Sequence, residues 1–474
     1  MLSLIIKKEI HDNLLNLRFV ATCVVSIILI ISSIIVLTDN YEDELRDYRS
    51  RVTTQDNFID QFGHFNRAGW MAVPLQEPSR FQPLVLGIDR EAAQENFVSN
   101  PVPVLFSRLD FLTIVTIIMS LIAILFAYNS ISGEREGGLL KQMLSTGVSR
   151  STILLGKFIG GNISLLIPFT IGIVSGLLYF TVSSTVQLHS MDYGVFPLLL
   201  LASYIYIAAF YGLGILFSTR SHSSNMAVLK SLFAWTILVL VLPNISPFLA
   251  AQIYRIPSWT KIQQEVFRIT SEERDEIIRK QERELLQTKF PDLAATIAGM
   301  NRNEIQAKAQ SDAAFKQRFA EYAKDYDELV RDVNTRQHEQ AGKIRAAFDE
   351  ASKYQEKLAT FFASISPFSN LIFIATDLTE SGIEADNRWE SQSSSFSRTL
   401  WTYMEARYNT EKGRNPAFGY NDYLDMRDRP HFQYQPQAIG ERIGLVLPQV
   451  GLLVLFNLLF FAGAFVSFLR YDVR

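Results

Sequence analysis

The chain has 474 residues, of which 48% are hydrophobic and 20% are charged. This balance is too apolar for an ordinary soluble protein and too charged for a protein made only of membrane spans, so it predicts a membrane core with sizeable water-exposed parts. The net charge of -3 argues against nucleic acid as a partner. The single cysteine, Cys23, excludes an intrachain disulfide.

The N-terminal region combines basic and apolar side chains before a long uncharged run. Residues 1–18 predict a cytoplasmic interfacial helix, and residues 19–37 are long enough to form the first transmembrane helix. A cleaved signal peptide is the alternative, but no small-residue cleavage site follows the apolar run. We therefore expect a retained first span.

Residues 38–110 are polar and predict a small extracytoplasmic domain. Its first part, residues 41–60, favours a helix that continues from the span, and glycines and prolines then favour loops or short strands. The side chains expected to pack this domain are Phe65, Trp70, Phe81 and Leu84.

Five further apolar segments bring the predicted number of transmembrane helices to six. They cover residues 111–130, 153–181, 196–218, 231–250 and 443–469. Gly172 and Gly176 in the third span form a small-xxx-small pair that favours close helix contact. Pro243 and Pro247 predict a break near the outer end of the fifth span.

The fold class predicted from this pattern is a mainly α polytopic membrane protein with a large, mostly helical extracytoplasmic domain over residues 251–440. Pro291 and Gly299 divide its first part into the helices of a hairpin, and one helix is expected over residues 311–358. A heptad seam on that helix comprises Phe315, Phe319, Tyr322, Tyr326, Leu329 and Val333. This seam packs either against the first helix of the hairpin or against a partner protein.

The last part of this domain contains a short apolar stretch and an aromatic-rich stretch. Residues 361–375 are too few to span the bilayer and predict a re-entrant or interfacial helix. Residues 380–440 are expected to fold with the helical hairpin. Six spans place both termini on one side, and lysine and arginine in the short inner segments make that side the cytoplasm, including the tail 470–474.

The motifs of several enzyme and transporter classes are missing from the sequence. It contains no phosphate-binding loop, no Gly-x-Ser-x-Gly and no His-Glu-x-x-His, so we expect no catalytic residue, no metal site and no enzymatic activity in this chain. The centres of the spans lack ionisable residues, which argues against an ion-coupled carrier or an intramembrane protease. Energy for any transport must then come from another subunit.

Residues 131–152 form a charged, amphipathic segment between the second and third spans. Leu139, Leu140, Met143 and Leu144 are spaced to lie on one face of a helix at the membrane surface. On physical grounds alone, a segment that receives force from a partner and a simple surface anchor are equally acceptable interpretations.

Three short runs carry a resemblance to a known family: GEREGGLL at 133–140, LSTGVSR at 144–150 and LGK at 155–157. Together they resemble the coupling segment of type-2 ATP-binding-cassette permeases, above all the group with gliding-motility and multicopper-enzyme-maturation permeases. Gly138 stands where that pattern usually has threonine. The large insertion before the last span agrees with this subgroup.

The resemblance implies the permease subunit of an ATP-driven exporter, or of a machine doing mechanical work, in the bacterial inner membrane. A separate ATPase subunit would bind ATP and magnesium, so this chain needs no cofactor. The other implied partners are a second or related permease, membrane lipid and a periplasmic protein. The alternative is a non-transporting scaffold or sensor that binds a periplasmic partner through its helical domain.

The resemblance also implies which residues couple the chain to the ATPase, with Glu134, Glu136 and Arg150 forming salt bridges to it. The full set is Glu134, Arg135, Glu136, Gly137, Leu140, Met143, Leu144, Ser149 and Arg150.

Overall fold

The computed structural model describes residues 1–63, 73–87, 109–145, 147–182, 192–415, 418 and 422–470. Within these residues the fold is helical and contains no β-strand, which confirms the predicted mainly α class. Residues 73–87 form turns and loops rather than strands, and Phe65 and Trp70 lie outside the described residues.

Among the described residues, six helical stretches are long and apolar enough to span a membrane, as predicted. They are α2 (Leu17–Phe62), α6 (Phe111–Thr113) with η1 (Ile114–Met119) and α7 (Ser120–Ala127), α10 (Arg150–Val182), α11 (Val195–Arg220) preceded by η2 (Asp192–Gly194), α12 (Ser224–Trp235) with η3 (Thr236–Val241) and α13 (Leu242–Ile253), and α21 (Ile439–Leu469). The segments η1 and η3 are π-helical turns within the second and fifth spans.

The predicted break at Pro243 and Pro247 is wrong. Pro247 lies inside α13, which is continuous to Ile253. Proline is tolerated in membrane helices because neighbouring groups compensate for the backbone hydrogen bond that it removes.

The first and third spans approach each other closely at two glycines, as their spacing predicted. A Cβ atom on Gly172 would lie 2.9 Å from Cδ1 of Ile30, and one on Gly176 would overlap Cδ1 of Ile34. Both isoleucines belong to α2 and are fully buried. The absence of side chains on this face of α10 therefore allows α2 to pack against its backbone.

A short helix, α19 (Pro367–Leu378), lies among the spanning helices. At its start the Ser366 hydroxyl donates to the carbonyl of Leu238, in the middle of the fifth span. At its end Arg442, near the beginning of α21, donates to the carbonyl of Leu378 at 3.2 Å. Twelve residues correspond to about 18 Å, roughly half of the hydrocarbon thickness.

The predicted apolar segment 361–375 is therefore divided between two helices. Its first residues complete α18 (Ala313–Ala363), and α19 begins only after the turn that ends at Ser366. That α19 is a re-entrant helix stays a prediction.

The continuation of α2 beyond the first span shares a buried apolar cluster with α20 (Ile383–Arg414) and an extended segment. Ile59 of α2 joins Leu400, Met404 and Tyr408, which recur every four residues on one face of α20, together with Leu424 and Met426. The prediction that residues 380–440 fold with the helical hairpin is wrong, because α20 belongs to the compact unit that contains α2 and not to the unit that contains the hairpin. We call this assembly of the α2 continuation, α20 and residues 422–437 the composite region.

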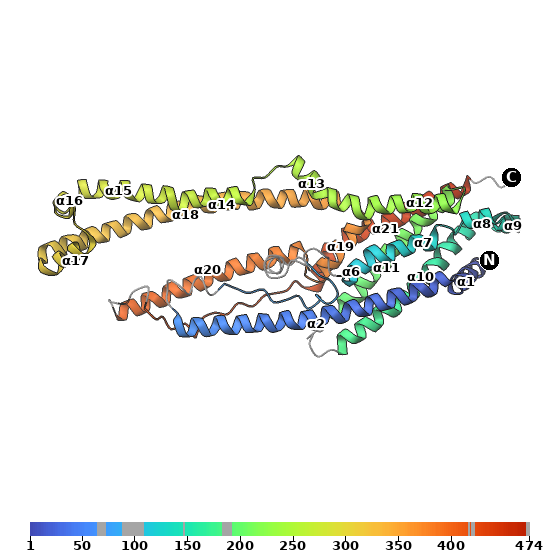
Figure 1. Cartoon of the computed structure of the whole chain (residues 1–474), viewed down its shortest axis with the longest axis horizontal. Coiled ribbons are helices and arrows are strands. Elements are labelled where there is room, and N and C mark those ends of the chain that lie inside the picture. The colour runs from blue at the N-terminus through green and yellow to red at the C-terminus, as the bar shows by residue number, and fades with distance from the viewer. Residues whose placement is uncertain are drawn as a thin grey trace. The chain divides into compact units, whose positions relative to one another are not determined.

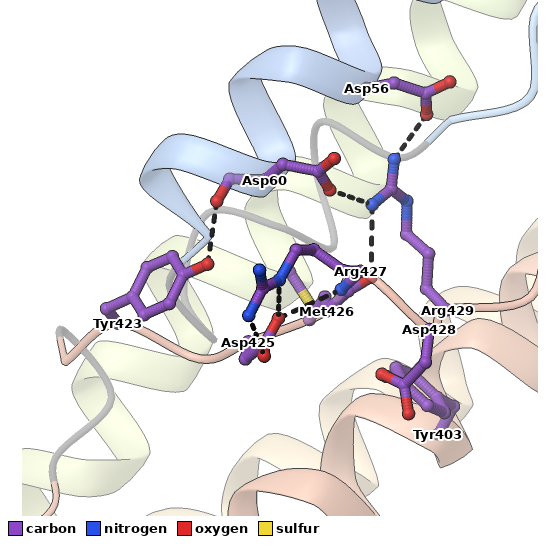
Figure 2. A network of polar contacts seen from close by, with 9 residues as sticks. All are labelled: Asp56, Asp60, Tyr403, Tyr423, Asp425, Met426, Arg427, Asp428 and Arg429. Atoms are coloured by element: carbon purple, nitrogen blue, oxygen red, sulfur yellow. Dashed lines mark hydrogen bonds and ion pairs between the residues drawn. The ribbon is translucent and has the colours of Figure 1, made fainter.

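A buried arginine holds the composite region together. The guanidinium of Arg429 is 5% exposed and forms ion pairs with Asp56 and Asp60, one turn apart on α2. It also donates to the carbonyl of Met426, and the Tyr423 hydroxyl donates to the backbone oxygen of Asp60 at 2.7 Å. Figure 2 shows Arg429 reaching from its extended segment to both carboxylates.

Residues 245–362 form a second compact unit. In it α14 (Trp259–Phe267), η4 (Arg268–Glu273) and α15 (Arg274–Thr288) run antiparallel to α18, with α16 (Pro291–Ile297) and α17 (Arg302–Ser311) at the turn (Figure 1). The predicted hairpin is confirmed.

The heptad seam of α18 packs within this hairpin. Phe315 and Tyr322 join a cluster with Phe290 and Leu293, against which Leu285 and Leu286 of α15 pack. Further along α18, beyond the seam, Ala341 joins a second cluster with Ile262 and Val266 of α14. Of the two alternatives for the seam, packing within the hairpin and contact with a partner protein, the structure adopts packing within the hairpin.

We expect Arg429→Met to destabilise the composite region by about 2 kcal/mol, because it leaves two carboxylates of like charge facing each other in a partly buried place. The measurement is the thermal unfolding midpoint of the purified protein in detergent. Arg427→Met is the matched control, since Arg427 is 71% exposed and its ion pair is with Asp425 in the same segment. Equal midpoints for the two variants would contradict the role of Arg429.

A second prediction concerns Asp377 at the end of α19. Burial and the nearby carboxylate of Glu384 raise the pKa of Asp377 to about 6. The folded protein therefore binds a proton at Asp377 more tightly than the unfolded chain does. The free-energy cost of ionising Asp377 in the folded protein is present above pH 6 and disappears as the pH falls towards 4.

Asp377→Asn should remove this penalty and stabilise the protein by on the order of 1–2 kcal/mol at pH 7.5, with little effect at pH 4.5. Thermal midpoints at the two pH values measure the difference, and the exposed Glu390→Gln serves as the control for the loss of one charge. The same gain at both pH values would rule out a titrating Asp377.

Candidate functional site

The candidate site is the segment between the second and third spans, which the structure folds into two short helices. These are α8 (Ser132–Glu136) and α9 (Leu139–Ser145), separated by Gly137 and Gly138. Gly138 has φ +74°, in the left-handed region that glycine adopts without strain. We call residues 131–150 the elbow. It is not one continuous amphipathic helix.

The first turn of α8 is fixed from the end of α11. The buried hydroxyl of Ser218 accepts hydrogen bonds from the backbone N–H groups of Ile131, at 3.0 Å, and Ser132, at 2.9 Å. It thereby satisfies two donors that a helix start leaves without intrahelical partners. This contact sets the position of α8 relative to the fourth span.

Glu134 points from α8 towards α1 (Leu2–Leu14) and α10. Its carboxylate lies 2.9 Å from the ammonium of Lys157, which also lies 3.1 Å from the carboxylate of Glu9 on α1. Lys157 is 3% exposed, so the ammonium is removed from water and held between two carboxylates. Lys8 adds a second, half-exposed cation 3.9 Å from Glu134.

The next two residues of α8 bind a different pair of helices. Arg135 donates to the carbonyls of Ser221, at 2.8 Å, and Thr219, at 3.2 Å, where α11 ends. Glu136 accepts from the backbone N–H of Ser224, at 3.1 Å, and from its hydroxyl, at 2.7 Å, where α12 begins. Successive residues of a helix point about 100° apart, which is why neighbouring charges reach different helices.

The second helix of the elbow, α9, has one buried and one exposed face. Leu140 is fully buried, and Met143 and Leu144 pack against the same core. Leu139 is 52% exposed, so the expectation that it shares the buried face is wrong. The exposed face of α9 comprises Leu139, Lys141, Gln142 and Ser145.

The elbow ends where α10 begins. The Ser149 hydroxyl accepts from the N–H of Thr152 at 3.2 Å, capping the helix. Arg150 donates to the carbonyls of Phe468, at 3.4 Å, and Leu469, in the last turn of α21. The start of the third span is thus tied to the end of the sixth, and Figure 1 shows α1, α8 and α9 at this end of the first unit.

The structure thus places every charged residue of the predicted coupling set in a bond within the chain. The sequence-based interpretation missed Glu9, Ser218 and Ser224 as partners, and it used Lys157 only as part of the family motif and as one of the inner basic residues. A signal for the α1 contact was available in the glycines of α10. A Cβ on Gly156 would lie 2.6 Å from Cγ2 of Ile5, and one on Gly160 would lie 2.8 Å from Cβ of Glu9.

No group of three or more histidine, cysteine, aspartate or glutamate side chains suited to a metal ion occurs in the part of the chain that the structure describes. The side chains of the elbow can form hydrogen bonds, ion pairs and apolar contacts. Its arrangement suits mechanical contact with another protein.

We expect Gly160→Leu to displace α1 and to destabilise the protein by about 1–3 kcal/mol, because the new side chain must occupy space filled by Glu9 and by the backbone oxygen of Ile6. Thermal unfolding of the purified protein measures the loss. Gly451→Leu on α21 is the control, since no atom lies within 4 Å of a Cβ there. An unchanged midpoint for Gly160→Leu would show that α1 does not pack as described.

Comparison with known proteins places the chain in a family. The family described as "ABC-2 family transporter protein" matches residues 3–473. A probable ABC transporter permease protein NosY from Pseudomonas aeruginosa is 31% identical over 150 residues, which are 32% of this chain and 53% of that protein. A NosY of Stutzerimonas stutzeri is 45% identical over 60 residues, 13% of this chain and 22% of that protein.

The chain thus spans about half the length of the first relative and less of the second. The family match, in contrast, extends over nearly all of the 474 residues. This polytopic membrane protein therefore belongs to the ABC-2 family of transporter proteins.

Proposed function

We propose that this chain is the permease subunit of an ATP-binding-cassette transporter in the bacterial inner membrane. A separate ATPase subunit binds and hydrolyses ATP with magnesium, and the permease converts the resulting motion into substrate export or mechanical work. Family membership supports this role, and the name of the NosY relatives, probable ABC transporter permease proteins, agrees with it.

The observation that carries the proposal is the set of bonds made by the elbow. Its side chains contact α1, α10, α11, α12 and α21, so a displacement of α8 and α9 reaches the ends of several spans. A segment that served only as a surface anchor would not need bonds to so many helices. Packed elements that shift as rigid bodies are a common way to transmit a conformational change.

The proposed ATPase-binding surface is the exposed face of α9 together with the glycines at its two ends. Leu139 supplies an apolar contact, and Lys141 and Gln142 supply polar ones. Glu134, Arg135, Glu136 and Arg150 then fix the shape of the elbow through their bonds within the chain. That they also form salt bridges to the ATPase stays a prediction.

The proposed orientation places the elbow and both termini in the cytoplasm. The contact of Arg150 with the end of α21 puts the C-terminal end of the sixth span beside the elbow, and the contact of Lys157 with Glu9 does the same for α1. A second copy or a related permease completes the membrane part. The composite region and the hairpin then lie on the periplasmic side, where a periplasmic protein is the expected partner.

The test is binding of the ATPase subunit that co-purifies with the protein from its native membrane. Leu139→Asp combined with Lys141→Glu should weaken this binding about tenfold or more, equal to about 1.4 kcal/mol, because both changes fall on the exposed face of α9. Titration of the purified subunits gives the dissociation constant.

Lys280→Glu, an exposed lysine of α15, is the matched control for the charge reversal and should leave the constant unchanged. Wild-type affinity in the α9 double variant would exclude this face as the binding surface. A wild-type protein that never associates with an ATPase would overturn the proposed function itself.

A further inference from the structure

The helix α8 lies between two pairs of helices and is bonded to each pair by different residues. On one side Glu134 meets Lys157 of α10 and, through it, Glu9 of α1. On the other side Arg135 and Glu136 meet the junction of α11 and α12. The two sets of bonds share no residue.

We infer that Glu134, acting through Lys157, is the positioning residue that makes α1 and α10 follow the motion of the elbow. This inference rests on the proposed function, since the motion is that imposed by the ATPase subunit. Arg135 and Glu136 pass the same motion to α11 and α12, so the charged run of α8 divides the displacement between two helix pairs.

The geometry makes the Glu134 branch a stiff connection. The ammonium of Lys157 is 3% exposed, and the two carboxylates are 14% and 16% exposed, so water screens their attraction weakly. With Lys8 the group contains two cations and two anions and is electrically balanced. Separating Lys157 from Glu134 would leave a buried ion without its partner, which is strongly unfavourable.

The packing of α1 on α10 explains why both helices move together. At Gly156 and Gly160, α10 has no side chain facing α1. The side chains of Ile5 and Glu9 of α1 occupy the space that is left. A pull on Lys157 therefore acts on α10 directly, and on α1 through Glu9 and through these contacts. The N-terminal helix is then a moving part of the transporter.

The test uses a neutral triple variant, Glu9→Gln with Glu134→Gln and Lys157→Met. Replacing all members of a buried ionic group together is often tolerated, whereas removal of one member is not, so we expect a folded protein. We expect the variant still to bind the ATPase, because the exposed face of α9 is unchanged, and turnover is compared at saturating ATPase so that the loss of a salt bridge from Glu134 does not affect the comparison. ATP turnover by the assembled complex should fall about fivefold or more, a usual size for coupling between sites.

Lys157→Arg keeps the positive charge that pairs with Glu9 and Glu134, so it should keep most of the ATP turnover. Glu411→Gln with Arg414→Met neutralises an exposed ion pair in α20 and is the control for the chemical changes. If the triple variant does not fold, Glu134→Gln alone replaces it, because Lys157 then keeps Glu9 as its partner.

A distance measurement separates positioning from plain stability. In a Cys23→Ser background, spin labels are placed at His11 on α1 and Gln142 on α9, and titration first establishes that the labelled protein binds the ATPase with the affinity of the unlabelled one, since Gln142 lies on the proposed binding face. The two labels should keep a constant separation through the ATP cycle in the otherwise wild-type protein. In the neutral variant this separation should change with nucleotide.

Wild-type turnover in the neutral variant, or a separation that varies in the wild type, would overturn the inference and leave the proposed function intact. A wild-type protein that binds no ATPase would overturn both.

Discussion

The arrangement of the cytoplasmic end of the first unit depends on one buried ammonium group. Lys157 lies at the start of the third span, where water is excluded, and an unpaired cation there would be costly. Two carboxylates from different helices neutralise it, and this requirement brings α1 and α8 onto α10. Glycines in place of side chains on α10 then allow the close approach that these ion pairs need.

The composite region contains the same distribution of charge, with both carboxylates on one helix. There a single guanidinium, that of Arg429, neutralises two aspartates of one helix and joins a C-terminal segment to the continuation of the first span. In both places one buried cation between two carboxylates connects segments that are far apart in sequence. Each cluster is specific because a shift of one helical turn would take at least one carboxylate away from its cation.

The sequence was sufficient to predict the six spans, the helical hairpin and the helix that continues from the first span, because hydrophobic periodicity is local and strong there. It also identified the elbow as the candidate site. It did not reveal that Glu134 and Arg150 bind within the chain, since pairings such as Glu134 with Lys157 depend on the tertiary fold. The cluster that joins α20 to α2 was missed for the same reason, and Leu139 was assigned to the buried face because spacing along a helix does not give the width of the face that the rest of the protein covers.

The composite region has a consequence for biosynthesis. Ile59 leaves the ribosome about 340 residues before Leu400, the first buried member of its cluster on α20, so at usual elongation rates it waits roughly 20–70 s for its partner. During that interval the apolar face of the α2 continuation stays uncovered while four further spans are inserted. Such a long sequence separation also slows folding, because a large loop must close before the contact forms. Nascent chains that stop before residue 400 leave this face exposed, and they present a natural substrate for chaperones and quality-control proteases.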